Sequence, residues 1–354
     1  MPRWTLNIAA LVAVVMFWVA CPAYAADATA PAINPVLGPP PTQSGKIDVA
    51  VGMHISNIAS IDEVAGEFDI VAYLFMRWND PRLAYEPTAQ STQTQPRDVN
   101  PADIWMPKVM IVNAVGPRDK YDIETNVKPD GTVNYTERCK LKLSAKFELR
   151  RFPFDTQRLP ILIHPFAGDA HLLTFSLNNH KLWLSSELNY YSSLAQWDLK
   201  AVTPTIGEYL FLDQTKVPEA RFEIEVTRQS AFYLLKVFLP LILMVFLSWA
   251  AFWIETGDLQ NQLQVGILTI LTVIAFALAI SSTMPRVPYL TYIDAFFLQC
   301  YVFVFLAIAE LMTVHVSHRS NRRDRGVRIR SYSRWVVPMA FLISNVYLAV
   351  HYLG

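Results

Sequence analysis

The chain has little cysteine and no excess of charge of either sign. Three of its 354 residues are cysteines, and its 30 basic side chains balance its 30 acidic ones. Because nucleic-acid-binding domains are usually basic, zero net charge argues against nucleic acid as the main partner. The seven histidines show no metal-ligand spacing, so we expect no metal and no cofactor. No pattern of nucleophile and base is visible, which argues against an enzyme.

The expected N-terminal signal segment contains one of the three cysteines, so its removal would leave two. Residues 1–25 have the features of a secretory signal: a basic start, a short apolar run and small residues before the expected cleavage site. A proline-rich leader follows over 26–45. Of the two remaining cysteines, Cys139 precedes and Cys300 falls inside a long apolar run. We therefore expect no disulfide bond in the exported part of the protein.

The region 46–229 has the pattern of short β-strands. Apolar residues recur at every second position in three runs, which are Val49, Val51, Met53 and Ile55; Leu141, Leu143, Ala145, Phe147 and Leu149; and Phe222, Ile224 and Val226. The turn sequence Pro129-Asp130-Gly131 separates two such segments. No part of this region has a convincing helical period, so we expect a single β-sandwich with its own core.

The region 230–354 instead contains four long apolar runs, Ala231–Ile254, Leu259–Ser282, about 293–316 and Trp335–Leu353. Each is long enough to cross a bilayer core of roughly 30 Å as a helix. The connection His318–Arg334 carries seven arginines and one aspartate. The positive-inside rule places this connection in the cytoplasm, in agreement with an exported N-terminal domain, and therefore places the C-terminus outside.

The second apolar run has an unusual face. Six side chains at helical spacing share one stripe, which consists of Gln264, Leu268, Leu271, Ala275, Leu278 and Ser282. A buried amide in lipid costs several kcal/mol unless it is hydrogen-bonded, so Gln264 should face water or protein. A ring of such helices would line a pore with a dry waist at Leu268 and Leu271. The alternative is a seam between the helices of a packed bundle.

Several motifs resemble those of bacterial pentameric ligand-gated ion channels, relatives of the Cys-loop receptors. They are Arg151-Phe152-Pro153-Phe154-Asp155, Trp105-Met106-Pro107 followed by Asn113, Pro240, and the run from Met284 to Tyr289. The segments 129–135, 263–264 and 285–289 are most similar to the amine-gated member from Erwinia. The resemblance implies an immunoglobulin-like, all-β extracellular sandwich followed by a four-helix transmembrane bundle, assembled as a homopentamer around a central pore. The two Cys-loop positions fall at Ala145 and Leu159, so the bond named for that loop is missing.

In this family the ligand binds between subunits among aromatic rings, which attract cations by about 0.5–2 kcal/mol each. The resemblance implies ligand-binding roles for Tyr73, Met110, Tyr135, His164, Phe166, Tyr209 and Phe211. Met110 and His164 replace two acids that hold the amine in the Erwinia relative, so a neutral, aromatic or anionic ligand stays open. Because histidine ordinarily titrates near pH 6.5, as an approximate value, His164 would make binding pH-dependent. For each aromatic residue, a place in the sandwich core is the alternative.

A second implied cluster lies at the junction of the two regions. Asp155, with Phe154 before it, and Arg228 match positions that pair in the family, and Asp62 or Glu63 would complete the cluster. A desolvated network of arginine and carboxylates can adopt two arrangements, as transmission requires. Pro285 and Pro288 stiffen the linker on which the cluster would push. An ordinary structural ion pair is the alternative.

The resemblance leaves ion selectivity open at the inner mouth of the pore, which consists of Glu255, Asp258, Gln260 and Asn261. Gln260 and Asn261 stand where cation-selective members often carry carboxylates, but the Pro-Ala-Arg signature of anion-selective members is also missing. A ring of Asp258 carboxylates would favour cations. Alternatively, Glu255 and Asp258 are solvated turn residues.

Taken with the apolar stripe, the resemblance implies a cation-selective channel in the inner membrane of a bacterium, with its N-terminal domain and its C-terminus in the periplasm. Its expected partners are further copies of the chain, a small-molecule agonist, monovalent cations and membrane lipids. Two alternatives remain: a proton-gated channel of the same family and a non-conducting, membrane-anchored sensor protein.

Overall fold

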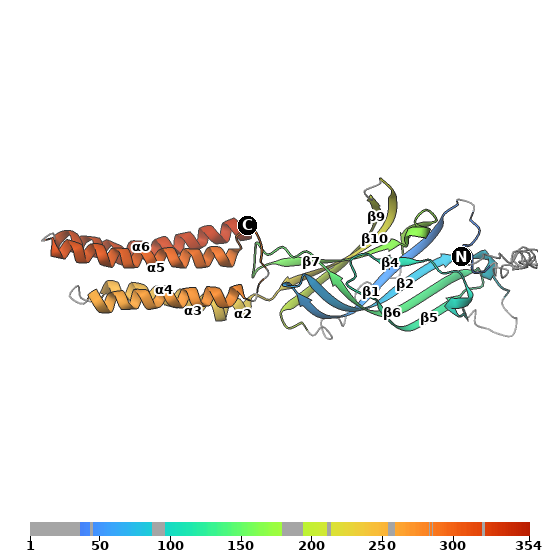
Figure 1. Ribbon diagram of the computed structural model, residues 1–354, viewed down its shortest axis with the longest axis horizontal. Coiled ribbons are helices and arrows are strands. Elements are labelled where there is room, and N and C mark those ends of the chain that lie inside the picture. The colour runs from blue at the N-terminus through green and yellow to red at the C-terminus, as the bar shows by residue number, and fades with distance from the viewer. Residues whose placement is uncertain are drawn as a thin grey trace, which may run out of the picture.

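The computed structural model describes residues 36–42, 45–86, 96–178, 194–210, 214–253, 259–282, 284, 286–320 and 323–354. The expected signal segment, most of the leader and four expected site residues, Phe211, Glu255, Asp258 and Pro285, lie outside this part. The described chain is elongated, with all of its strands at one end and its long helices at the other (Figure 1).

In the described part of the chain, ten strands form two sheets. One sheet contains β1 (Ile47–Asp62), β2 (Glu67–Asn79), β3 (Arg97–Asp98), β5 (Asp119–Val127), β6 (Thr132–Ser144) and β8 (Leu173–Leu177), in the order β3-β5-β6-β2-β1-β8. The other contains β4 (Val109–Ile111), β7 (Thr156–Pro165), β9 (Trp197–Leu210) and β10 (Lys216–Arg228), in the order β4-β7-β10-β9. Neighbouring strands are antiparallel except β1 and β8, which are parallel. The expected β-sandwich is confirmed.

The alternating pattern of the sequence becomes the inner surface of this sandwich. Val49, Val51, Met53 and Ile55 of β1 are fully buried. Phe222, Ile224 and Val226 of β10 are buried as well. Successive side chains of a strand point to opposite faces, so a strand with one buried face shows this period of two.

One strand is shorter than its pattern predicts. The alternation continues to Leu149, but β6 ends at Ser144. Phe147 and Leu149 are buried, yet the backbone between them bonds to a side chain rather than to a neighbouring strand. The Glu148 N–H donates to Gln157 Oε1 at 3.0 Å, and Gln157 Nε2 donates to the Glu148 carbonyl at 2.8 Å. Burial therefore follows the apolar pattern here, while strand pairing does not.

The turn between β5 and β6 forms where the sequence predicts it. The Gly131 N–H donates to the Lys128 carbonyl at 2.9 Å, and Asp130 Oδ1 accepts from the Thr132 N–H at 2.9 Å. Gly131 has a φ of 81°, and a Cβ at this position would lie 2.6 Å from the Asp80 carbonyl oxygen. Both the backbone conformation and the close approach therefore require glycine.

Four membrane-length helical segments follow the sandwich, as expected from the four apolar runs. The first combines α2 (Ala231–Tyr233), a π-helical turn (Leu234–Phe238), α3 (Leu239–Ala250) and a 3₁₀ turn (Ala251–Trp253). The others are α4 (Leu259–Ser281), α5 (Tyr292–Arg319) and α6 (Arg323–Leu353). The π-helical turn ends at Phe238, two residues before Pro240, which has no N–H to continue an α-helical ladder.

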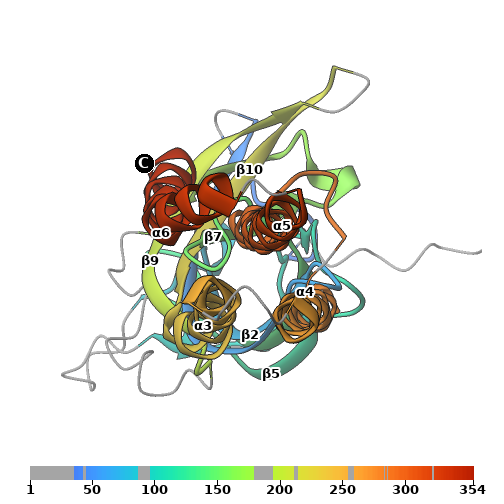
Figure 2. The same ribbon diagram turned by 90° about the vertical axis from the view of Figure 1, so that its left-hand side faces the viewer.

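The helix α6 begins earlier than its apolar run predicts, because arginines are good helix formers. Its 31 residues give a helix of about 46 Å, longer than a bilayer core of roughly 30 Å. The basic N-terminal turns therefore extend beyond the hydrocarbon. Viewed along the bundle, α3, α4, α5 and α6 lie at the corners of a square (Figure 2).

Candidate functional site

The stripe predicted to line a pore lies on the face of α4 that the other helices leave uncovered. All six of its residues, Gln264, Leu268, Leu271, Ala275, Leu278 and Ser282, are exposed, and the exposed fractions of Leu271 and Leu278 are 60% and 67%. Gln260 and Asn261, in the first turn of α4, are exposed too. A single chain thus presents an uncharged, mainly apolar helix face to its surroundings.

The opposite face of α4 packs inside the bundle. Thr269 and Val273 are buried, and a Cβ at Gly266 would lie 2.7 Å from Cγ1 of Ile308 in α5. This close approach fixes the rotation of α4 about its axis. The stripe is therefore held outward by packing on the other side of the helix.

Part of the expected ligand site gathers on the four-stranded sheet. Met110 of β4 pairs with His164 of β7, and the His164 ring lies 5.2 Å from the ring of Tyr209 in β9. Phe166 follows β7, and its N–H donates to the Lys108 carbonyl at 2.7 Å. Met110, Phe166 and Tyr209 are 41%, 55% and 45% exposed, so this surface is apolar and aromatic.

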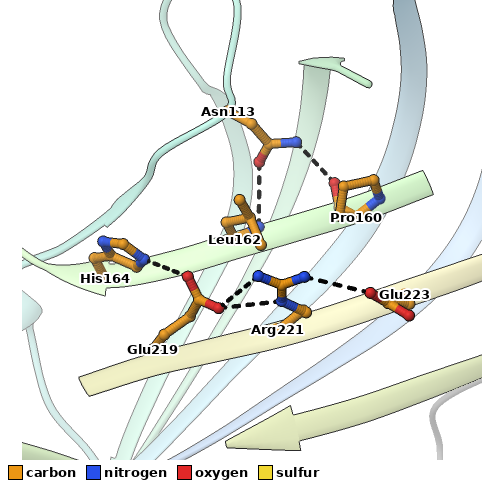
Figure 3. A network of polar contacts seen from close by, with 7 residues as sticks. All are labelled: Asn113, Pro160, Leu162, His164, Glu219, Arg221 and Glu223. Carbon is orange, nitrogen blue, oxygen red and sulfur yellow. Dashed lines mark hydrogen bonds and ion pairs between the residues drawn. The ribbon is translucent and has the colours of Figure 1, made fainter. Parts of the chain in front are cut away.

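His164 lies beneath this surface rather than on it. It is 3% exposed, and its Nε2 lies 2.8 Å from Glu219 Oε2 on β10. The other carboxylate oxygen of Glu219 accepts from Arg221 Nε at 3.1 Å and from Arg221 Nη2 at 2.9 Å. Arg221 Nη1 in turn reaches Glu223 Oε1 at 3.4 Å, so the polar chain runs along β10 (Figure 3). His164 therefore supports this surface from below, and its expected contact with a ligand stays a prediction.

This network keeps the carboxylate of Glu219 ionised. Burial alone would raise the pKa of Glu219, but the hydrogen bonds from His164 and Arg221 outweigh it, and the pKa lies below its ordinary value. Glu219 was not among the residues predicted from the sequence, although its spacing carries a signal. Glu219, Arg221 and Glu223 occupy every second position of β10 and so share one face of the strand.

Asn113 of the Trp-Met-Pro motif region ties the sheets together beside this network. Its Nδ2 donates to the Pro160 carbonyl at 2.7 Å, and its Oδ1 accepts from the Leu162 N–H at 3.1 Å (Figure 3). Nδ2 also donates to the Ser144 carbonyl at 2.9 Å. Each side-chain atom thus satisfies backbone groups of β6 or β7. Its role in this structure is to position β7, and with it His164.

The two remaining expected ligand residues lie on the six-stranded sheet. Tyr73 of β2 is partly exposed, with the rings of His54 and Phe75 at 6.0 and 6.4 Å and the Arg138 guanidinium at 5.9 Å. Tyr135 of β6 is only 5% exposed. Among the described residues, no contact joins Tyr73 to the aromatic surface on the other sheet.

The polar end of Tyr135 points to a buried acid. Its hydroxyl donates to Glu137 Oε2 at 2.5 Å, and burial together with this carboxylate raises the pKa of Tyr135. Glu137 is fully buried and also pairs with Arg118 at 2.9 Å and Lys120 at 3.3 Å. The hydroxyl of Tyr135 is therefore engaged inside the subunit, and a ligand-binding role for this residue stays a prediction.

At the junction of the sandwich and the bundle, Arg228 holds two acids. Its Nε lies 2.8 Å from Asp155 Oδ1, its Nη2 lies 3.2 Å from Asp155 Oδ2, and its Nη1 lies 2.8 Å from Glu63 Oε1. The guanidinium also stacks over Trp197 and Phe152, with 4.1 and 4.7 Å to the ring centroids. Burial opposes the charge of Arg228, but Asp155 and Glu63 outweigh it and raise the pKa.

The structure selects Glu63 rather than Asp62 as the third member of this cluster. Asp62 Oδ1 accepts from the N–H groups of Val64 and Ala65 at 3.0 and 2.9 Å, so this carboxylate stabilises its own turn. Trp197, whose indole forms one wall around Arg228, was not predicted from the sequence.

The loop before β7 joins the helices through further contacts. Phe154 packs against Tyr292 of α5 and Phe238, with ring centroids 5.6 and 6.4 Å apart. The Tyr292 N–H donates to the Arg150 carbonyl at 2.8 Å, and the Leu149 N–H donates to the Tyr289 hydroxyl at 3.0 Å. Pro288 is exposed in the same linker. The loop before β7 therefore contacts the segment between α4 and α5 directly.

Comparison with known proteins yields two family matches. The neurotransmitter-gated ion-channel ligand binding domain matches residues 33–230, and the neurotransmitter-gated ion-channel transmembrane region matches residues 237–331. A proton-gated ion channel of Gloeobacter violaceus is 28% identical over 346 residues, which cover 98% of this chain and 92% of that protein.

Animal receptors are similar over a smaller share of their length. The human gamma-aminobutyric acid receptor subunit rho-3 is 27% identical over 296 residues, which cover 81% of this chain and 62% of that subunit. The rat subunit rho-1 is 28% identical over 290 residues, which cover 80% of this chain and 59% of that subunit. The chain thus spans about three fifths of the length of these two receptor subunits.

Proposed function

The chain belongs to the neurotransmitter-gated ion-channel family of pentameric ligand-gated channels, and from this premise we propose that it is a homopentameric, cation-selective channel opened by a small ligand. In this proposal, residues 46–229 form a periplasmic ligand-binding domain and residues 230–354 form the channel. The protein resides in the inner membrane of a bacterium, with its C-terminus in the periplasm.

The outward stripe of α4 is the observation that carries this proposal. Five copies around one axis would bring Leu268 and Leu271 of each chain together as a narrow apolar waist. A channel of this kind closes when the waist loses water and conducts when the helices move apart. Gln264 and Ser282, at opposite ends of the stripe, would then face the aqueous entrances.

The expected ligand residues lie on two different sheets, and this separation supports ligand binding between neighbouring copies. Met110, Phe166 and Tyr209 lie on the four-stranded sheet, whereas Tyr73 lies on the six-stranded sheet. A second copy that places its Tyr73 against this surface would complete one site per interface. A ligand that binds one arrangement of the interface more tightly than the other shifts the population toward the arrangement that it prefers. The size of the shift is set by the difference between the two affinities.

Transmission to the pore is assigned to the cluster of Arg228, Asp155 and Glu63. It fixes the end of β10 against the loop before β7, and that loop contacts Tyr289 and Tyr292 around the start of α5. The linker with Pro285 and Pro288 then leads back to the pore helix. Selectivity for cations is assigned to Glu255 and Asp258 at the inner mouth, next to the uncharged Gln260 and Asn261.

Reconstitution of the full chain into liposomes tests the proposal. We expect single-channel currents that reverse at the potassium potential in a potassium chloride gradient. Currents that reverse at the chloride potential would overturn the cation assignment alone. No current under any ligand or pH would leave a membrane-anchored sensor as the function.

Opening by protons is the second candidate, and two observations favour it. The Gloeobacter violaceus relative is a proton-gated ion channel. In addition, the buried His164 lies 2.8 Å from Glu219, directly under the aromatic surface, and histidine is the side chain that usually changes charge between pH 5 and 8. A pH jump without added ligand separates the candidates: current on acidification alone favours protons, and current that requires a small molecule favours a ligand.

A further inference from the structure

A cluster of three charged residues lies near the end of the helical bundle that is farthest from the sandwich. The end of α5 and the start of α6 meet there (Figure 1). Glu310 belongs to α5 and is 8% exposed, and Arg330 of α6 is 6% exposed. Arg334, one helical turn further along α6, is partly exposed. Because buried charges in membrane-length helices are costly, they are kept mainly where they have a function.

The two arginines hold the end of the first helical segment. Arg330 Nη2 donates to the Ala251 carbonyl at 3.0 Å. Arg334 Nε donates to the Phe252 carbonyl at 3.1 Å, and its guanidinium lies 5.7 Å from the centroid of the Trp253 ring. Both carbonyls belong to the 3₁₀ turn that follows α3, where the backbone has no further helical N–H to bond. A cation is favoured at this end of a helix, so α6 caps the first segment.

Glu310 faces the same arginines without a bond to either of them. It interacts electrostatically with Arg330 and Arg334, which are the charged groups that act on it within the described chain. Neither of its carboxylate oxygens has a hydrogen-bond partner among the described residues, and the same holds for Nε of Arg330. A guanidinium carries five N–H donors and bonds most strongly to a carboxylate. Glu310 is therefore an alternative acceptor for Arg330.

The turn that the arginines hold leads to the pore helix. Residues 254–258 connect Trp253 with Leu259, where α4 begins, and Gln260 and Asn261 of the inner mouth lie in its first turn. A connection of this length spans at most about 20 Å, so the position of the turn limits where α4 can begin. Figure 2 shows α6 diagonally across the bundle from α4. An effect of α6 on the pore helix therefore passes through its neighbours α3 and α5.

We propose that Arg330 and Arg334 position the inner mouth of the channel by holding the turn at the end of the first helical segment. Glu310 releases this hold when it takes Arg330 from the Ala251 carbonyl. Two acceptors then compete for one guanidinium, and the two resulting arrangements form a two-state element. The effect on ion flow rests on the proposed function, whereas the effect on the end of α3 does not.

Hydrogen exchange of the detergent-solubilised full chain tests the hold itself. In Arg330→Gln, the amides at the end of α3 should exchange at least about tenfold faster than in the wild type, the scale of one charge-assisted hydrogen bond. In Glu310→Gln they should exchange no faster than in the wild type, because the charged competitor is gone. Arg330→Lys keeps the charge and should restore most of the protection.

Arg328→Gln is the matched control for these variants. Arg328 is an exposed arginine of the same helix, and its Nε donates to the Asp324 carbonyl of α6 itself at 3.4 Å. Its replacement removes the same charge and should leave exchange at the end of α3 unchanged. If Arg330→Gln does not elute as the wild-type oligomer, Arg334→Gln, which removes the other bond of the hold, gives the same comparison.

Single-channel recording of these variants tests the step from the hold to the pore. The open probability at a fixed stimulus should change in opposite directions in Arg330→Gln and Glu310→Gln, by about fivefold or more in each. The reason is that one variant removes the hold and the other removes the group that releases it. A purely structural role would reduce the number of channels in both variants and leave the open probability of the remaining channels unchanged.

The outcomes separate this inference from the proposed function. Wild-type exchange at the end of α3 in folded Arg330→Gln would overturn the hold. Open probabilities that change in the same direction in both variants, or in neither, would overturn the competition between the Ala251 carbonyl and Glu310. The expected exchange results in a protein that gives no current under any condition would keep the hold and remove the channel function.

Discussion

Arg228, the last residue of β10, binds both carboxylate oxygens of Asp155 while its backbone N–H donates to the carbonyl of the same aspartate at 3.1 Å. Gln157 Nε2 donates to Asp155 Oδ2 at 2.6 Å as well. The junction between sandwich and helices is therefore held by a buried, hydrogen-bonded charge pair, in which Glu63 also contacts Arg228 and Gln157 also contacts Asp155.

The first prediction concerns this pair. Arg228→Ala should leave ligand binding to the sandwich intact and weaken channel opening, because Asp155 and Glu63 lose their shared cation. Removal of one partner of a buried pair costs about 3–5 kcal/mol, so a lower melting temperature should accompany the loss. Binding by titration and current from liposomes measure the two effects separately. Arg158→Ala on the exposed face of β7 is the control, and normal opening of folded Arg228→Ala would remove Arg228 from the transmission role.

The second prediction concerns the waist of the pore. Leu271→Ser should hydrate the narrowest apolar ring and give channels that leak at rest or open at lower stimulus. Resting flux of monovalent cations from loaded liposomes measures this. Leu298→Ser on α5, at a leucine that is 54% exposed, is the matched control and should not leak. If the resting flux through Leu271→Ser equals that of the wild type, the waist lies elsewhere.

The third prediction uses the lowered pKa of Glu219. A carboxyl whose folded-state pKa is lowered stabilises the protein above its unfolded value, here 4.5, and this contribution disappears as the pH falls through the folded-state pKa. The melting temperature of the wild type should therefore fall more steeply below pH 4.5 than that of Glu219→Gln. Glu208→Gln, at an exposed acid of β9, is the control. Parallel curves for wild type and Glu219→Gln would contradict the assignment.

The fourth prediction separates the two tyrosines of the six-stranded sheet. Tyr135→Phe removes the buried hydrogen bond to Glu137 and should lower stability by about 1–2 kcal/mol without changing ligand affinity. Tyr73→Ala, at the partly exposed position, should instead weaken the ligand that opens the channel and leave stability nearly unchanged. Denaturant unfolding and dose–response curves measure the two properties. A loss of affinity in Tyr135→Phe with unchanged stability would return Tyr135 to the ligand site.

Much of the architecture follows from local patterns. The four apolar runs became the four membrane-length helical segments, and the buried side chains of β1 and β10 are those that the alternation marks. The Pro129-Asp130-Gly131 turn forms through bonds among neighbouring residues. Each of these features depends on interactions within a few residues, or on the periodicity of an element with one side facing the core and the other facing solvent.

The candidate sites form where segments that are distant in sequence come into contact. Local sequence patterns do not predict these contacts. Asp62 and Glu63 are adjacent in sequence, yet only Glu63 meets Arg228, because the hairpin turn uses Asp62 for its own backbone. His164 and Tyr135 carry the right chemistry for a ligand surface, but each is turned toward a buried glutamate. The sequence alone does not show which glutamate the fold places next to each of these two side chains.

The amino-acid sequence by itself determined the two-part architecture, the membrane spans and the outward stripe of α4, since hydrophobic periodicity and length decide these against water and lipid. The tertiary structure alone decided the polar partners: Glu219 for His164 and Glu137 for Tyr135. The physical reason is that burial is favoured for any apolar side chain, whereas a hydrogen bond or ion pair requires one particular partner within about 3 Å.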